Sequence, residues 1–209
     1  MKRSASSRQW LSRHVNDPYV QRSKKEGYRS RAAYKLIEID DRDRILAPGA
    51  VVVDLGAAPG GWTQVSVKRA GPKGRVVAID LLEMEPVAGA TFLRGDFAGP
   101  AGLAAVEAAL AGARVDAVLS DMSPNISGIA ITDQARSMAL AELARDFALA
   151  HLKPGGAFLV KVFQGAGYEE FHRSLRAAFA KVAVRKPGAS RGESAELYLL
   201  ARGPKVPPP

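Results

Sequence analysis

The sequence predicts an α/β fold built on a seven-stranded, mostly parallel sheet, and three observations support this prediction. Apolar segments rich in β-branched residues alternate with segments of helical periodicity along most of the chain. One of these segments, residues 51–62 (VVVDLGAAPGGW), is a buried-strand pattern that closes on an acid and opens into a glycine loop. The last two strand-like segments, joined by a short Pro/Gly/Ser-containing connection, favour an antiparallel hairpin at the sheet edge. We therefore expect helices on both faces of the sheet.

The expected elements follow one another in regular order. Helical spacing over residues 30–46 is stopped by Pro48-Gly49, and Lys153-Pro154-Gly155-Gly156 predicts a turn. The other expected elements are strand 50–55, helix 61–70, strands 75–79 and 91–94, helix 101–111, strand 115–120, helix 132–152, strand 157–163, helix 168–180, and strands 181–185 and 195–201. A chain of 209 residues accommodates one sizeable domain of this kind. We divide it into a basic arm (1–30), an α/β domain (31–203) and a disordered tail (204–209).

The composition excludes several classes of protein. The chain has no cysteine, which excludes disulfides, cysteine-ligated zinc and thiol nucleophiles. Its three histidines, His14, His151 and His172, are far apart, and we expect no metal site. No run of 18 apolar residues is present, and the N-terminus lacks the apolar centre of a secretory signal. We expect no membrane association and a cytoplasmic location.

The net charge of +9 is concentrated at the N-terminus. Residues 1–31 hold nine Lys/Arg against Asp17 and Glu26, which gives +7 and leaves +2 for the rest of the chain. Aromatic residues are interleaved with these cations: Trp10, Tyr19, Tyr28 and Tyr34. Cations that contact phosphates beside planar side chains that stack on unpaired bases predict a nucleic-acid partner. The alternative is a solvated basic arm whose aromatic residues pack on the core.

The glycine loop predicts the type of ligand. Gly56, Gly60 and Gly61 allow close approach of a ligand to the backbone, but their spacing departs from the G-x-G-x-x-G dinucleotide fingerprint, and no P-loop follows. A pyrophosphate is therefore disfavoured. The next expected strand, 75–79, ends at Asp80, whose carboxylate can accept hydrogen bonds from ribose hydroxyls. An adenosine without phosphates fits both observations.

This combination resembles the class I methyltransferases, which have a Rossmann-like fold and bind S-adenosylmethionine (SAM). Asp96 follows the third strand-like segment, where members of that class contact the adenine end of the cofactor. Considered alone, Asp96 could equally be a helix N-cap before Pro100. A Rossmann dehydrogenase is the alternative class.

Two charged residues stand where ligands gather in open α/β sheets, at the carboxyl ends of strands. Asp121 follows strand 115–120 within SDMSPN, and Lys161 lies in the apolar run FLVKVF. A lysine in such a strand is costly unless it is paired. The alternatives are a turn cap for Asp121 and a side chain that reaches solvent from a strand end for Lys161. Enzymes that methylate the exocyclic amines of bases commonly have an aromatic residue here that stacks on the base. SDMSPN has none, which favours a hydroxyl as methyl acceptor.

Several motifs in order resemble the FtsJ-type family of ribosomal RNA large subunit methyltransferase E. They are YKLIEI around Lys35, DLGAAPGGW, DLL after Ile79, GDF around Asp96, SDMSPNISG, VKVFQG, and SAELYLL around Glu196. The resemblance begins in the basic arm, which argues against a transit peptide, and runs to about Gly203. Departures are confined to Ser123, where alanine is usual, and to residues 128–132.

The resemblance implies a site and a substrate. The Lys-Asp-Lys-Glu set of RNA ribose 2′-O-methyltransferases corresponds to Lys35, Asp121, Lys161 and Glu196. The residues implied to bind SAM are Gly60, Trp62, Asp80, Asp96 and Asp121; no metal is implied. Trp62 could instead be a core aromatic. The implied substrate is a uridine in the A-loop of 23S rRNA in the large ribosomal subunit, modified by a monomeric enzyme.

Two other functions remain open. An RNA-binding assembly factor that has lost catalysis would lack part of the Lys-Asp-Lys-Glu set, whereas all four residues are present. A small-molecule methyltransferase would not need an arm that carries +7.

Overall fold

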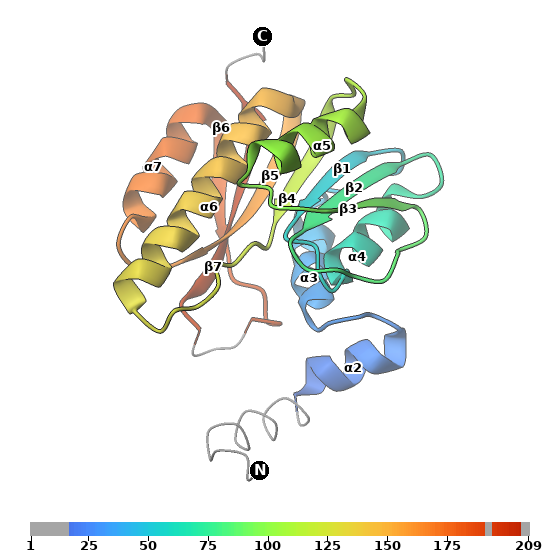
Figure 1. Ribbon diagram of the computed structural model, residues 1–209, viewed down its shortest axis with the longest axis horizontal. Helices are drawn as coiled ribbons and strands as arrows, with labels where there is room; N and C mark the ends of the chain where they lie inside the picture. The colour runs from blue at the N-terminus through green and yellow to red at the C-terminus, as the bar shows by residue number, and fades with distance from the viewer. Residues whose placement is uncertain (1–16, 191–193, 206–209) are drawn as a thin grey trace.

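A seven-stranded sheet in the order β3-β2-β1-β4-β5-β7-β6 forms the centre of the computed structural model, which describes residues 17–190 and 194–205 (Figure 1). The strands are β1 (Val51–Leu55), β2 (Arg75–Asp80), β3 (Ala90–Arg94), β4 (Val115–Ser120), β5 (Leu152–Phe163), β6 (Phe179–Arg185) and β7 (Glu196–Pro204). β1 to β5 are parallel, and β7 lies antiparallel between β5 and β6. The predicted sheet and its antiparallel edge hairpin are confirmed.

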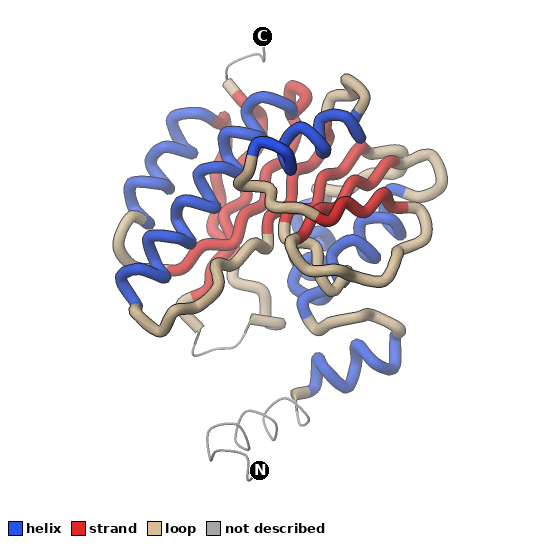
Figure 2. The backbone as a smooth tube through the Cα atoms, viewed as in Figure 1, coloured by secondary structure: helices blue, strands red, loops and turns tan. Residues whose placement is uncertain are grey.

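Helices cover both faces of the sheet, so the core is double (Figure 2). The helices of one face are α5 (Pro100–Leu110), α6 (Ala130–His151) and α7 (Tyr168–Ala178), and those of the other are α3 (Ala32–Asp43) and α4 (Gly61–Ala70). Neighbouring residues of β1 belong to different cores: Val53 packs with the α5–α7 layer and Val52 with the α3–α4 layer. This alternation is what a strand buried on both faces requires.

Some element boundaries differ from the predicted ones. The predicted turn at 153–156 lies within β5, as an irregular stretch between the pairs Leu152–Val115 and Ala157–Ala117. The helix predicted over 30–46 ends at Asp43, because Arg44 adopts a left-handed conformation with φ of 51°. Pro204 closes β7, whereas residues 206–209 of the predicted tail lie outside the described residues.

The basic arm contains a helix that sequence analysis missed, α2 (Pro18–Glu26). The Asp17 carboxylate accepts a hydrogen bond from the Tyr19 amide, proline occupies the first turn, and Gly27 ends the helix with φ of 76°. These are ordinary helix-boundary signals that the sequence itself contains. Residues 1–16, including Trp10, lie outside the described residues.

Tyr34 follows the alternative interpretation of the basic arm, in which aromatic residues pack on the core. Its ring is 1% exposed and lies 5.6 Å from the rings of both Tyr19 and Tyr28, while its hydroxyl donates to Glu26. A tyrosine that buries its ring in this way stabilises the fold and cannot also meet a base. The three described tyrosines therefore attach α2 to α3, as in the alternative interpretation.

The buried carboxylate of Asp40 fixes the end of α3, the helix that carries Lys35. It accepts hydrogen bonds from the amides of Ile45 and Leu46 at 3.0 and 2.8 Å and lies 3.2 Å from Arg69 Nε. It thereby holds the turn after the helix.

We expect Asp40→Ala to lower the free energy of unfolding by about 2–4 kcal/mol, because two buried amides lose their acceptor. Urea unfolding measures this, with Asp41→Ala as the matched control. Asp41 also pairs with Arg69, but its side chain is exposed, so its removal should cost less than about 1 kcal/mol. Equal losses from the two variants would contradict this interpretation of Asp40.

Candidate active site

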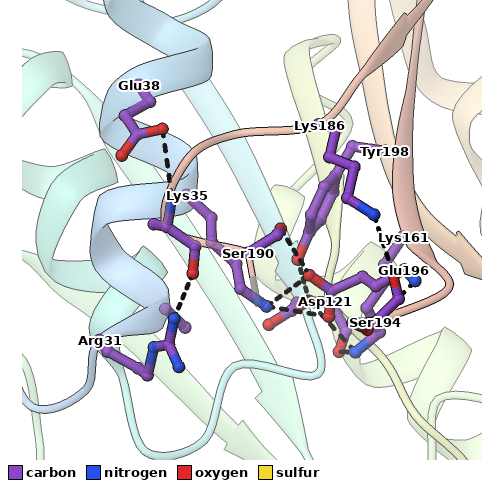
Figure 3. Close-up of polar contacts among 12 residues, drawn as sticks. Arg31, Lys35, Glu38, Asp121, Lys161, Lys186, Ser190, Ser194, Glu196 and Tyr198 are labelled. Carbon is purple, nitrogen blue, oxygen red and sulfur yellow. Dashed lines mark hydrogen bonds and ion pairs between the residues drawn. The ribbon is translucent and has the colours of Figure 1, made fainter. Parts of the chain in front are cut away.

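Two ion pairs meet at the carboxyl end of the parallel strands (Figure 3). Lys161 Nζ lies 3.1 Å from Asp121 Oδ1 and donates to the Asp121 carbonyl at 2.7 Å. Lys35 Nζ lies 2.7 and 2.9 Å from the two carboxylate oxygens of Glu196. The structure thus brings together all four residues of the predicted Lys-Asp-Lys-Glu set.

Strand register explains why these residues meet. Lys161 of β5 is directly opposite Tyr198 of β7, and Glu196 precedes Tyr198 by two residues, on the same strand face. That face packs on α3, which supplies Lys35. Asp121 comes directly after β4, where its amide donates to the Leu55 carbonyl at the end of β1. The four side chains therefore lie on three strand ends and the helix that covers them.

Lys161 is buried and paired. It is 8% exposed, and both of its partners belong to Asp121. The alternative in which the side chain reaches from a strand end into solvent does not describe its position. An ammonium has three N–H groups, so one of them is left for a ligand.

Tyr198 links the two ion pairs, and sequence analysis missed it. Its hydroxyl donates to Asp121 Oδ1 at 3.0 Å, and its ring centroid lies 5.6 Å from Lys35 Nζ. Burial, together with the negative charges of Asp121 and Glu196, raises the pKa of the Tyr198 phenol well above its usual value. The hydroxyl therefore keeps its proton and remains a donor. The signal was the spacing of two from Glu196, which places both side chains on one strand face.

A serine orients Glu196 from the loop after β6. Ser190 Oγ donates to Glu196 Oε1 at 2.9 Å, and Lys186 Nζ donates to the Ser194 carbonyl at 2.8 Å. Glu196 thus receives hydrogen bonds from a cation and from a hydroxyl, which fixes the direction of its carboxylate.

A pocket of about 300 Å³ adjoins Asp121. Its lining combines three acids with apolar groups: Asp80, Asp96 and Asp121, with Ile79, Leu81, Leu82, Phe97, Met122 and Leu140 among the others. Each of the two outer acids is fixed by backbone amides, Asp80 by those of Ala58 and Leu82, and Asp96 by that of Ala98. Apolar walls suit a base, and fixed carboxylates suit hydroxyls and a cationic centre.

This lining fits the cofactor implied by the sequence. In SAM, the flat face of the adenine suits the apolar walls of the pocket, and the ribose hydroxyls, the amine and the positively charged sulfonium suit its carboxylates. Within residues 17–190 and 194–205, no group of three or more His, Asp or Glu residues could hold a metal ion.

That Gly60 and Trp62 bind SAM stays a prediction. Among the described residues, neither Gly60 nor Trp62 belongs to the pocket lining. Gly60 precedes α4 with φ of 107°, and Trp62 is buried, with its indole donating to the Ala32 carbonyl. Asp96 is not the N-cap of α5, because Gly99 holds that position.

Asp54 lies fully buried at the end of β1, beneath the glycine loop. Thr63 Oγ1 donates to its Oδ2 at 2.7 Å, and its Oδ1 has no hydrogen-bond partner among the described residues. Burial raises the pKa of the Asp54 carboxyl to about 7, the hydrogen bond from Thr63 opposes this rise, and the negative Asp121 and Asp80 add to it.

Comparison with known proteins places the chain among RNA-modifying enzymes. Residues 28–204 match the FtsJ-like methyltransferase family. A protein named ribosomal RNA large subunit methyltransferase E from Azoarcus sp. is 62% identical over 200 residues, covering 96% of this chain and 98% of the relative. A protein of the same name from Marinobacter nauticus is 54% identical, covering 99% and 100%. The crystal structure of a ribosomal RNA methyltransferase from Plasmodium falciparum, 28% identical, has a TM-score of 0.75 over 85% of this chain and 98% of that one.

Asp54 should make stability depend on pH. Below about pH 4 its carboxyl is protonated in both the folded and the unfolded chain. Between there and about pH 7 only the folded chain keeps the proton, so the free energy of unfolding falls as pH rises, by up to about 4 kcal/mol. Asp54→Asn keeps an acceptor for Thr63 and has no charge to lose. In urea unfolding, we expect the stability of this variant relative to wild type to increase from pH 5 to 7 and to level off above pH 8. A difference that is constant with pH would contradict the raised pKa.

Proposed function

The chain belongs to the FtsJ-like methyltransferase family, and on that premise we propose that it transfers the methyl group of SAM to a ribose 2′-hydroxyl of ribosomal RNA. The proposed acceptor is a uridine in the A-loop of 23S rRNA in the large ribosomal subunit. The observation that carries the proposal is the presence of two ion pairs, Lys35–Glu196 and Lys161–Asp121, beside a pocket lined by three acids. The names of the relatives support ribosomal RNA as the substrate.

The reaction requires alignment and removal of one proton. SAM, when bound, supplies a methyl group activated by the adjoining sulfonium. Asp80 and Asp96 hold the nucleoside end of the cofactor, and Asp121 lies at the boundary between the pocket and the ion pairs. The residues that align the hydroxyl oxygen with the methyl carbon account for most of the rate acceleration, because in-line displacement depends on that alignment.

We assign the proton to Lys161. The contacts that Asp121 makes with its Nζ fix the direction of the remaining position, which faces the substrate hydroxyl. Lys161 first releases one ammonium proton to solvent, and its neutral amine then accepts the hydroxyl proton as the new carbon–oxygen bond forms, which restores the ammonium. Tyr198 donates to Asp121 and so keeps that carboxylate in place throughout.

Lys35 has a different role in this proposal. Its ammonium pairs with Glu196 and is only partly buried, so it can contact a phosphate or the ribose of the substrate nucleotide. Glu196, held by Ser190, positions this ammonium.

The division of the chain follows the charge. We propose that residues 1–30 form an RNA-binding arm and residues 31–203 a SAM-dependent methyltransferase domain that acts as a monomer in the cytoplasm. The described part of the arm presents exposed Lys24 and Lys25 at the end of α2. No helix within the described ranges is long and apolar enough to cross a membrane.

We expect Lys161→Met to lower methyl transfer by a factor of roughly 10²–10⁴, because it removes the proton acceptor and keeps the length of the side chain. The assay follows tritium from labelled SAM into large subunits that lack their modifications, with the product nucleoside identified. Lys153→Met is the matched control, since Lys153 lies at the other end of β5 and pairs with Asp116. Label recovered as anything other than 2′-O-methyluridine would overturn the assignment of the acceptor.

The arm should bind RNA through phosphates. We expect the double variant Lys24→Ala/Lys25→Ala to weaken RNA binding and to reduce the slope of log K against log salt by roughly 1.5–2. Binding titrations at several salt concentrations measure both effects. Lys73 and Lys181 are also exposed but lie outside the arm, so their double alanine variant is the control. The same slope in the two double variants would argue against α2 as the RNA contact.

A further inference from the structure

The segment between α2 and α3, residues 27–32, is bonded to the wall of the cofactor pocket; we name it the α2–α3 corner. The guanidinium of Arg29 donates through Nη1 to the carbonyls of Pro59 and Glu85 and through Nη2 to the Pro86 carbonyl at 2.7 Å. One side chain therefore bridges two separate loops. A planar guanidinium suits this task, because its donors point in fixed directions.

Both loops that Arg29 joins also line the pocket. The first runs from Gly56 to Gly60 and contributes Gly56 and Ala58 to the lining. The second follows β2 and contributes Leu81 and Leu82 before it reaches Glu85 and Pro86. The Asp80 carboxylate ties the same two loops together from the pocket side, through the amides of Ala58 and Leu82. Arg29 thus holds the two loops together on the side away from the pocket, and Asp80 holds them together on the side that faces it.

The backbone of the corner is bonded to the first turns of α4 as well. The Arg29 amide donates to Gln64 Oε1 at 2.9 Å, and Gln64 Nε2 donates to the Gly27 carbonyl at 3.0 Å. The indole of Trp62 donates to the Ala32 carbonyl at 2.8 Å. These bonds place the corner against the start of α4, directly behind the glycine loop.

The last two glycines of the loop make room for the corner. A Cβ at Gly60 would lie 2.8 Å from Arg29 Nη1, and a Cβ at Gly61 would lie 2.5 Å from Ser30 Oγ. Neither glycine belongs to the lining of the pocket formed by the described residues. Gly56 differs, since it lines the pocket and a Cβ there would strike Met122. The two glycines therefore make room for the corner, and the predicted approach of a ligand to the backbone of Gly60 stays a prediction.

We propose that Arg29 is a positioning residue for SAM, and that the α2–α3 corner holds the two cofactor loops at the spacing that binds it. The identity of the ligand rests on the proposed function. Because the corner continues directly into α2, the same bonds attach the basic arm to the back of the cofactor pocket. Affinity for the cofactor then depends on a segment that never touches it.

Arg29→Lys tests the proposal with the charge retained. The single nitrogen of a lysine cannot reproduce the two separate donor nitrogens of the guanidinium, so we expect the dissociation constant of S-adenosylhomocysteine, measured by calorimetry without RNA, to rise about tenfold. Arg42→Lys, an exposed position at the end of α3, should bind as wild type does. Thermal unfolding verifies that both variants are folded. A folded Arg29→Lys protein with wild-type affinity would overturn the proposal.

A rescue experiment tests the corner independently of Arg29. Gly61→Ala should weaken S-adenosylhomocysteine binding at least fivefold, because the new methyl group pushes against Ser30. Ser30→Ala should change little, since the buried Ser30 hydroxyl has no hydrogen-bond partner among the described residues. The double variant should recover affinity to within about twofold of wild type. Wild-type binding by Gly61→Ala, or a double variant as weak as Gly61→Ala, would count against the corner.

The wild-type protein separates the two levels of the proposal. If it fails to bind S-adenosylhomocysteine, the proposed function and this inference fail together. If it binds and methylates RNA while Arg29→Lys and Gly61→Ala bind equally well, the function stands and only the role of the corner is refuted.

Discussion

A lysine buried near the carboxyl end of β5 is the constraint on which the rest of the site depends. Removing an ammonium from water costs several kcal/mol unless a well-placed anion compensates, and Lys161 of β5 is almost fully buried. Asp121 supplies both the carboxylate and a carbonyl, so the chain after β4 must turn at that residue. Tyr198 then holds the carboxylate from β7. Contacts to one buried charge thus join the ends of β4 and β5 to the start of β7.

The antiparallel position of β7 completes the set. Because β7 enters between β5 and β6, its first residues reach the carboxyl ends of the parallel strands, where Glu196 meets Lys35 from α3. A parallel strand at that place would bring its last residues there. The antiparallel strand therefore brings together in one site two residues, Lys35 and Glu196, that are 161 positions apart in the sequence.

The features that could be predicted from the sequence are those set by local pattern, and the features that could not are those set by contacts between distant segments. Strand alternation gave the sheet, and the rule of carboxyl ends selected Asp121 and Lys161 before any contact was known. The contact of Tyr198 with Asp121 depends on the register of β5 and β7, which no local pattern sets. The same limit explains Gly60 and Gly61: a pattern shows that no side chain is tolerated there, but only the fold shows that the α2–α3 corner is the neighbour.

The distribution of charge separates the two ligands of the proposed reaction. Positive charge is concentrated on the arm, whereas acids gather around the pocket. Asp80 and Asp121 are close enough to Asp54 to raise the pKa of its carboxyl. A polyanion is thereby attracted to the arm, and a cation to the pocket. The proposed methyl donor is cationic only until transfer, because the sulfonium becomes a neutral thioether when the methyl leaves. The attraction of the acids for the cofactor therefore weakens once the methyl group has left. The carboxylates thus favour the charged donor over the neutral thioether product, which eases replacement of the product by a new donor.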